Sequence, residues 1–258
     1  MPNDFDVSAK NYDKVFTFTN IGKAQRKQVH KFINKTICQN KKLSILELNC
    51  GTGEDAIYFT KNGHKVLATD ISEEMINVAK SKNNNICFLQ QEINTITSKT
   101  FQKKFDLIFS NFGGLNCLSK SQLELFLQKS SKLLNPDGKL LLVLMPKHCL
   151  WERFYFLLKG KHKKAFRRNT NKAILANVDG IQVQTWYYNP KEIVSLTEKL
   201  YVLGMVKPIG ISIPPTYLEP FFSKRKSLLK ILIKMERLLS NRFWAKYADH
   251  YLIEFTRI

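Results

Sequence analysis

The residues best suited to chemistry lie together in one turn, residues 47–55. A short apolar run that includes Ile45 and Leu46 enters this turn, and a helix-like pattern follows it. Gly51 and Gly53 would let backbone N–H groups approach a ligand closely, and the following helix would present the positive end of its dipole. The turn is therefore suited to a nucleotide-like or anionic ligand.

A carboxylate follows at the end of the next predicted strand. Asp70 comes 23 residues after Glu47, at a position where a carboxylate can hold the two hydroxyl groups of a ribose. A dinucleotide fingerprint would place its third glycine at position 56, which is Ala56, and would bring a pyrophosphate against Glu54 and Asp55. Those two acids disfavour a dinucleotide and favour a cationic cofactor. The plainer alternative is that Glu47 and Asp70 only cap local structure.

Beyond this turn the chain contains an ordered series of motifs. An entry segment, Tyr12-Asp13, is followed by residues 47–53, 68–72 with Met75, 91–93, 105–112 and 134–139. On these motifs, residues 5–145 resemble the class I S-adenosylmethionine-dependent methyltransferases. The resemblance implies an α/β, Rossmann-like sheet of seven strands with helices on both faces, and S-adenosyl-L-methionine as the cofactor.

The resemblance also implies which residues bind the cofactor. Glu47, Gly51 and Gly53 would surround its methionine part, and Asp70 would bind its ribose. Ile71 and Met75 would sandwich the adenine, Glu92 and Ile93 would face its amino edge, and Asn111 and Phe112 would line the transfer channel. The other candidates for this site are Tyr12, Asn49, Cys50 and Thr52. The family more often has Gly, Asp and Gly at the positions of Asn49, Glu92 and Asp137. For Met75, core packing is an equal alternative.

These residues require a sheet whose strands end at a common edge. Alternating β-like and helix-period runs predict an α/β domain. The predicted strands are residues 43–49, 65–70, 86–91, 105–111, 139–145, 205–213 and 250–257. The predicted helices are residues 20–39, 53–61, 72–82, 119–134 and 190–200, with Asn20 and Ser72 as N-caps and a turn at 135–138. The first helix has an apolar stripe formed by Ile21, Ala24, Val29, Phe32, Ile33 and Ile37.

The regular alternation of predicted strands and helices ends after residue 146, and this indicates the domain organisation. We expect one domain over residues 1–258, with a cofactor-binding core in residues 1–146 and two insertions, 147–188 and 214–249, that form a cap. The 258 residues are 44% hydrophobic, which excludes a disordered chain.

No membrane-spanning segment and no secretory leader are visible, so we expect a cytoplasmic protein. The five cysteines, Cys38, Cys50, Cys87, Cys117 and Cys149, have no CxxC spacing, which predicts free thiols and no metal site.

The net charge of +20 is concentrated in the cap half of the chain. Residues 147–258 contain 21 basic and 8 acidic residues, and only 8 of the 41 basic residues in the whole chain are Arg. Such a field favours phosphate or anionic lipid, although the scarcity of Arg argues against reading of nucleic-acid sequence. A general preference for Lys in the composition would give the same excess without any partner.

One stretch of the cap, residues 224–246, predicts a basic amphipathic helix. Its apolar face contains Leu228, Ile231, Leu232, Met235, Leu238 and Leu239, and its other face contains Lys226, Lys230, Lys234, Arg237 and Asn241. Such a helix can lie on an anionic membrane surface, which predicts a peripheral association, or it can pack on its own cap. With the aromatic residues at 150–156, it favours an apolar or amphipathic acceptor.

Three functions remain open from the sequence. The first is methyl transfer to O or C of a small aromatic, isoprenoid or lipid-like intermediate, with His148 as a candidate general base that could equally be a surface residue. The second is methylation of RNA, which is disfavoured because Asn111 is followed by Phe112-Gly113-Gly114 and not by Pro-Pro and an aromatic residue. The third is a non-catalytic, cofactor-binding scaffold that holds a partner through residues 224–246.

Overall fold

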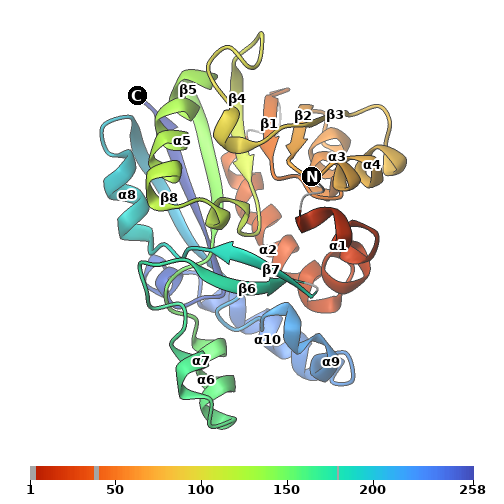
Figure 1. Ribbon diagram of the computed structural model, residues 1–258, viewed down its shortest axis with the longest axis vertical. Coiled ribbons are helices and arrows are strands. Elements are labelled where there is room, and N and C mark those ends of the chain that lie inside the picture. Colours follow the sequence, from red (N-terminus) through yellow and green to blue (C-terminus); the bar gives the residue numbers. More distant parts are fainter. Residues whose placement is uncertain (1–3, 38–40, 179) are drawn as a thin grey trace.

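A seven-stranded mixed sheet forms the centre of the protein. The computed structural model describes residues 4–37, 41–178 and 180–258, and within them the strand order is β3-β2-β1-β4-β5-β9-β8 (Figure 1). The strands are β1 (Ser44–Leu48), β2 (Lys65–Asp70), β3 (Cys87–Gln90), β4 (Phe105–Ser110), β5 (Leu134–Leu144), β8 (Tyr201–Ile209) and β9 (His250–Arg257). Strands β1 to β5 are parallel, and β9 is antiparallel to both β5 and β8. The carboxyl ends of the parallel strands therefore share one edge, as the sequence predicts.

Helices cover both faces of the sheet, because alternate strand residues are apolar on opposite sides. One core contains Leu46, Ile108 and Leu142 under α5 and α8, and the other contains Ile45, Phe109 and Leu141 under α2 and α3 (Figure 1). The helices are α1 (Asp4–Tyr12), α2 (Asn20–Thr36), α3 (Glu54–Lys61), α4 (Glu73–Lys82), α5 (Lys120–Leu133), α6 (Leu150–Leu158), α7 (His162–Ala165), α8 (Pro190–Thr197), α9 (Glu219–Phe222) and α10 (Lys226–Leu238). The predicted α/β fold is confirmed.

The start of α2 differs from the prediction. Thr19, not Asn20, is the N-cap, because its hydroxyl accepts a hydrogen bond from Gly22 N at 2.9 Å. Asn20 is already helical, and its side-chain amide donates to Glu219 at 2.7 Å. The predicted end of this helix at residue 39, like Cys38, lies outside the described residues. The predicted apolar stripe is buried against the sheet at Val29, Phe32 and Ile33, whereas Ile21 packs against Leu218 and Phe222 of the cap. Ser72 caps α4 as predicted.

The predicted turn at residues 135–138 is part of strand β5. Pairing with β4 jumps from Phe105↔Leu134 to Leu107↔Lys139, so the extra residues form an irregularity inside the strand. Asp137 has a positive φ of 58° there, which accounts for its turn-like sequence. Strand β8 also begins and ends earlier than the predicted 205–213, because Gly210 turns the chain away with a positive φ of 77°.

Both insertions contain structure that the sequence patterns do not predict. Residues 147–188 include a two-stranded hairpin, β6 (Ile174–Val178) and β7 (Ile181–Thr185), which lies in Figure 1 between the sheet and the cap helices. In the second insertion the predicted helix 224–246 is two elements, α10 and a 3-10 segment, η5 (Arg242–Lys246). None of the described helices is long and apolar enough to span a membrane.

Candidate cofactor site

The turn after β1 has the backbone that its glycines predict. Asn49, Gly51 and Gly53 all have positive φ values, of 44°, 53° and 80°. A side chain at Gly53 would place its Cβ 2.9 Å from the ring of Phe88, so only glycine fits this position. The turn then opens α3, whose first N–H groups face the same edge of the sheet.

Asn49 joins the ends of two strands. Its amide donates to the carbonyl of Asn111 at 2.7 Å, and its oxygen accepts from the Ser110 hydroxyl at 2.5 Å. Asn adopts a left-handed backbone more readily than most residues. A Cβ on Gly114 would lie 2.2 Å from Asn49 Cγ, so Gly114 leaves the space that the larger side chain needs.

Asp70 holds this turn at the end of β2. Its carboxylate accepts hydrogen bonds from Gly51 N at 2.7 Å and from Ser72 N at 3.0 Å. Burial raises the pKa of Asp70, and the two backbone hydrogen bonds act in the opposite direction. Asp70 therefore does accept local backbone hydrogen bonds, as the alternative prediction has it. Because a carboxylate has further acceptor sites, this leaves room for the predicted hydrogen bonds to a ribose.

Glu47 is a buried acid with spare hydrogen-bonding capacity. It is 1% exposed, and its Oε2 has no hydrogen-bond partner among the described residues. Burial, followed by the negative charge of Asp55, holds the pKa of Glu47 well above its usual range, against the opposing effect of Arg26. A buried carboxylate oxygen without a donor is suited to a cationic or N–H-bearing ligand group.

Asp55 forms a buried cluster beside the turn. Arg26 is ion-paired with its Oδ2, which also accepts from the Asn111 amide at 2.8 Å, and His30 Nε2 lies 2.6 Å from its Oδ1. Burial alone would raise the pKa of Asp55, but the charge of Arg26 and the hydrogen bond from His30 lower it well below its usual range. The guanidinium of Arg26 lies 5.2 Å from the centre of the Phe112 ring, and its Nε has no hydrogen-bond partner in the part of the chain that the structure describes.

The structure gives Glu54 and Asp55 a different role from the predicted one. From the sequence, we expect both charges to face the ligand and to favour a cationic cofactor. In the structure Asp55 is paired with Arg26, and Glu54 accepts from Lys82 at 2.9 Å. Asp55 is thus neutralised by Arg26, and Glu54 shares the charge of Lys82 with Asp13. Among the described residues, the carboxyl groups at this edge without an ion-paired cation are those of Glu47 and Asp70.

The N-terminal segment covers the site. In the π-helical turn η1 (Asp13–Thr17), Asp13 accepts from the Thr52 hydroxyl at 2.6 Å and pairs with Lys82 at 2.5 Å. The ring of Tyr12 lies 3.7 Å from where a Cβ on Gly51 would be, and burial raises the pKa of Tyr12 to about 12. The depression left beneath has a volume of about 20 Å³ and is lined by Tyr12, Arg26, Asn49, Cys50, Gly51, Thr52, Glu54, Asp55, Asn111 and Phe112.

The four residues predicted to hold an adenine lie outside this small depression. Met75 is buried at 2% exposure in α4, and Ile71 is half-buried at the end of β2. Glu92 is exposed and accepts from Asn94, while Ile93 packs against the core on the α5 side. Their roles toward an adenine remain predictions.

His148 lies in the cap. Its ring contacts Arg153 and packs 6.2 Å from the ring of Tyr247, and it does not line the depression at the turn. Burial, followed by the positive charges of Arg153 and Lys246, lowers its pKa. Its role as a general base remains a prediction.

The sequence patterns miss three residues of the site. Arg26 and His30 come from one face of α2, where their i, i+4 spacing is the signal that could have paired them. His250 packs edge-on against Phe112 at 5.5 Å, and only the folded sheet brings the two together. The thiols of Cys50, Cys87, Cys117 and Cys149 are free, and no metal-binding cluster of acids, His and Cys occurs within the described ranges.

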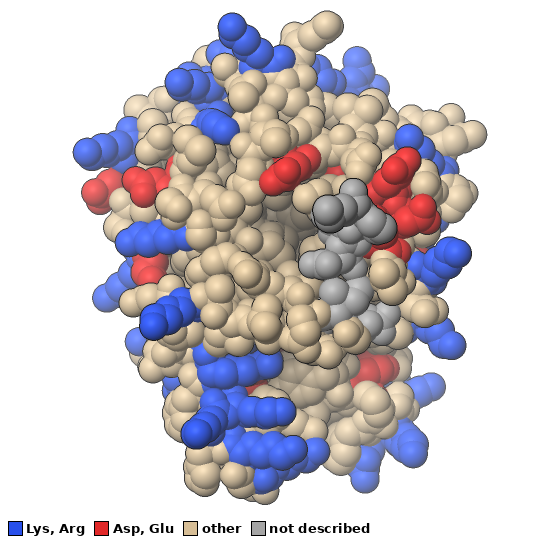
Figure 2. All heavy atoms as spheres, viewed as in Figure 1, with Lys and Arg blue, Asp and Glu red and all other residues tan. Residues whose placement is uncertain are grey.

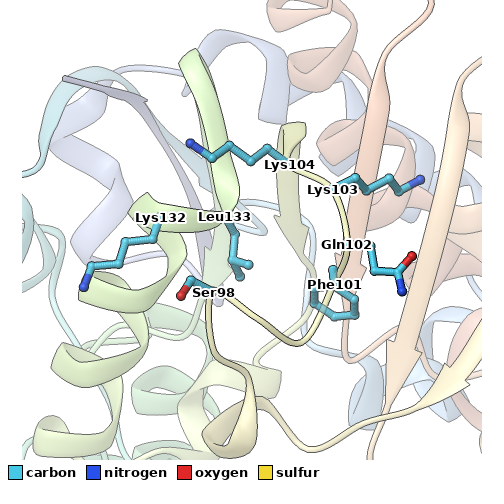
Figure 3. Close-up of a pocket in the computed structure, with 7 residues that line it drawn as sticks. All are labelled: Ser98, Phe101, Gln102, Lys103, Lys104, Lys132 and Leu133. Carbon is cyan, nitrogen blue, oxygen red and sulfur yellow. The ribbon is translucent and has the colours of Figure 1, made fainter.

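A larger depression lies at the opposite edge of the sheet. It has a volume of about 500 Å³ and is lined by residues that precede β4 and end α5. Figure 3 shows its three lysines, Lys103, Lys104 and Lys132, pointing in different directions. Because the ammonium groups do not converge, the depression has no arrangement that would hold an anion.

Comparison with known proteins relates part of the chain to a methyltransferase family. Residues 45–138 match the family model described as a methyltransferase domain. A malonyl-[acyl-carrier protein] O-methyltransferase of Bacillus anthracis is 28% identical over 174 residues, which cover 65% of this chain and 60% of that protein. The chain spans less than two thirds of the length of this curated relative.

Solved structures resemble the whole fold at low sequence identity. The DhpI-SAM-HEP complex has a TM-score of 0.63 at 17% identity and covers 98% of this chain and 94% of its own. Magnesium protoporphyrin IX methyltransferase (ChlM) from Synechocystis PCC 6803, with bound SAH, has a TM-score of 0.58 at 14% identity, with coverage of 92% and 85%.

Proposed function

We propose that this chain, whose residues 45–138 form a methyltransferase domain on the class I fold, uses S-adenosylmethionine to methylate a small acceptor. The observation that supports this best is the pairing of the glycine turn with Asp70, whose carboxylate meets Gly51 N at 2.7 Å. The unpartnered Oε2 of Glu47 is consistent with a cofactor that brings positive charge to this edge of the sheet.

The roles of the chain's own residues follow from their chemistry. Asp70 would accept from ribose hydroxyls, and Glu47 would offset the positive charge of the bound cofactor. Arg26 has an unpaired Nε–H beside the depression, where it would hold a carboxylate. The cofactor supplies an electrophilic methyl group on a sulfonium, so the protein mainly has to orient the acceptor and exclude water.

The acceptor in this proposal is an aromatic, isoprenoid or lipid-like intermediate that is methylated on O or C. The sulfur–methyl bond breaks as the acceptor–methyl bond forms, and the acceptor loses a proton. The similarity to a protein named for O-methylation of a carrier-bound malonyl group supports oxygen on an acyl-type acceptor. Phe112 and Phe16, whose rings meet edge-on at 5.4 Å, offer an apolar wall near the turn. We also propose peripheral contact of residues 224–246 with an anionic membrane, which does not depend on methyl transfer.

A turnover assay separates this proposal from its alternatives. Purified protein is incubated with S-adenosylmethionine carrying a labelled methyl group and with three acceptor sets: acyl carboxylates, isoprenoid phenols and bulk RNA. Label in the first or second set supports the proposal, and label in RNA alone would replace it with RNA methylation. Binding of the cofactor without transfer to any set would favour the scaffold.

A further inference from the structure

We propose that the cap end of this protein docks on the surface of an anionic lipid bilayer. The docking surface, called here the cap face, consists of the exposed side chains of residues 150–168 and 217–246. It extends the predicted contact of residues 224–246 to a surface built from both insertions. The docking itself does not depend on the proposed methyl transfer.

The two insertions pack together around a small apolar cluster that also includes Ile21 of α2. Trp151 of α6 packs edge-on against Phe222 of α9 at 5.9 Å, and Tyr155 lies 5.6 Å from Tyr217. The backbone N–H of Leu150 donates to the carbonyl of Tyr247 at 3.0 Å. Because these segments are packed together, their outer side chains belong to one end of the molecule, the lower end in Figure 1.

Helix α10 buries only part of its apolar surface in this core. Leu229 is 3% exposed, and Leu232 and Ile233 are partly buried beside it. A second apolar stripe, at i, i+3, i+7 and i+10, faces outward: Leu228 at 41% exposure, Ile231 at 55%, Met235 at 45% and Leu238 at 84%. The predicted alternative that the helix packs on its own cap therefore accounts for one stripe and leaves the other uncovered.

Further large apolar side chains are exposed on the same end. They come from α6, from the residue after α7, from the segment around α9 and from η5: Leu150, Phe154, Leu157, Leu158, Phe166, Tyr217, Phe221 and Phe243. Apolar groups gathered on one end are typical of interaction or membrane surfaces.

The cap face is also strongly basic. Its exposed cations are Lys159, Lys161, Lys163, Lys164, Lys224, Arg225, Lys226, Lys230, Lys234, Arg237 and Arg242. Figure 2 shows Lys and Arg side chains gathered over α6 and α7 at the lower left of the molecule. A surface of this charge attracts anionic headgroups, and each nearby cation adds to the attraction.

The acids of the two segments are all engaged by the protein itself. Glu152 is buried and bonded to Arg167 and Arg168. Glu236 is 1% exposed and accepts from the backbone N–H groups of residues 210–213. Glu219 accepts from the backbone of Asn20 and Ile21 at the start of α2. These acids therefore do little to offset the cations of the cap face.

An anionic bilayer is the partner that suits both the exposed apolar side chains and the positive charge of the cap face. A second copy of this chain would bring like charges together, which opposes association. RNA would match the cations but would leave aliphatic side chains such as Ile231 and Leu238 against phosphates and sugars. A bilayer offers anionic headgroups to the lysines and acyl chains to the apolar side chains at once.

Vesicle flotation tests the docking directly. The full chain is mixed with vesicles of phosphatidylcholine alone, or of phosphatidylcholine with an equal amount of phosphatidylglycerol. We expect the bound fraction to be at least about tenfold greater with the anionic vesicles and to fall as salt is added. Equal binding to both kinds of vesicle, or none to either, would overturn the proposal.

Two variants of exposed residues identify the surface. Ile231→Ser with Leu238→Ser, and separately Lys230→Glu with Lys234→Glu, should each lower the bound fraction by about tenfold. The matched control is Lys104→Glu with Lys132→Glu, which makes the same change in charge at the opposite edge of the sheet and should bind as the wild type does. Tight binding to bulk RNA that the serine variant leaves unchanged would replace the membrane with nucleic acid as the partner.

The same samples keep this proposal separate from the proposed function. Titration of S-adenosylhomocysteine into the two cap variants should match the wild type, since neither pair of residues lines the depression at the turn. Vesicle binding without cofactor binding would support the docking and contradict the proposed methyl transfer. Cofactor binding without vesicle binding would support the proposed cofactor site and overturn the docking.

Discussion

At the scale of single residues, Asn49 and Gly114 form a matched pair. Asn49 has a positive φ of 44°, and its side chain fills the space that a Cβ on Gly114 would need. We expect Gly114→Ala to lower the free energy of unfolding by about 1–3 kcal/mol, because the new methyl group overpacks this contact. Urea unfolding measures the change.

The double variant tests the coupling of the pair. Asn49→Gly with Gly114→Ala should be more stable than the sum of the two single changes predicts, because removing the Asn49 side chain relieves the clash. Simple addition of the two effects would show that these side chains do not compete for the same space.

Glu47 gives the binding site a predicted pH dependence. Its raised pKa keeps the carboxyl group neutral into the range above that of ordinary carboxyls. A cationic ligand favours the ionised form, so the affinity should increase with pH, by at most roughly tenfold per pH unit, until Glu47 ionises in the free protein. Calorimetric titration of S-adenosylmethionine between pH 5 and about 7 measures this slope.

Glu47→Gln is the control for this slope. The amide cannot ionise, so the variant should bind with an affinity that is nearly independent of pH over the same range. An equal slope in the variant and the wild type would assign the titration to another group.

At the scale of elements, the Asp55 cluster ties α2 to α3 and to the end of β4. Breaking a buried ion pair leaves a charge without its partner. We expect Asp55→Asn to lower the free energy of unfolding by about 3 kcal/mol at neutral pH. The pKa of Asp55 is lowered in the fold, so the difference is present above the usual carboxyl pKa and declines as pH falls below about 4.

The neighbouring acid supplies a matched control. Glu54→Gln removes a pair with Lys82 in which both side chains are 20–25% exposed, and it should cost less than about 1 kcal/mol. Urea midpoints of the two variants across pH measure both effects. A similar cost for both would mean that burial of the Asp55 pair does not matter.

The N-terminal segment should act as a movable cover. A depression of about 20 Å³ is too small for a nucleoside ligand, since ligand pockets occupy about 300–1,000 Å³. We therefore expect residues 5–17 to shift when the proposed cofactor binds. We expect S-adenosylhomocysteine to change hydrogen exchange there by about tenfold, while α5 keeps its rate. Binding with no change in residues 5–17 would show that the ligand lies elsewhere.

At the scale of the whole molecule, the sequence predicts the core better than the cap. The apolar runs of β1, β2 and β9 predict these strands closely because parallel or central strands are buried on both faces. Residues 135–138 have the composition of a turn, yet a local irregularity keeps them inside β5, and only pairing with β4 decides this. The β6–β7 hairpin has exposed residues along much of its length, so no clear hydrophobic pattern predicted it.

The site shows the same division between local and long-range information. The turn and Asp70 follow from short motifs, and the structure joins them through Gly51 N. Arg26, His30 and His250 come from distant parts of the chain, and their contacts with Asp55 and Phe112 exist only once the sheet has formed. The sequence motifs therefore locate the turn and Asp70, and the fold adds the groups that surround them.

The central claim is that this edge of the sheet binds S-adenosylmethionine through Asp70 and the glycine turn. Calorimetric titration of S-adenosylmethionine and S-adenosylhomocysteine into the wild type, Asp70→Ala and the control Glu124→Ala, an exposed acid on α5, tests it most directly. We predict micromolar binding by the wild type, a loss of at least about 100-fold in Asp70→Ala and a smaller change in the control. A folded wild-type protein that binds neither ligand, or an Asp70→Ala variant that binds as tightly, would contradict the claim.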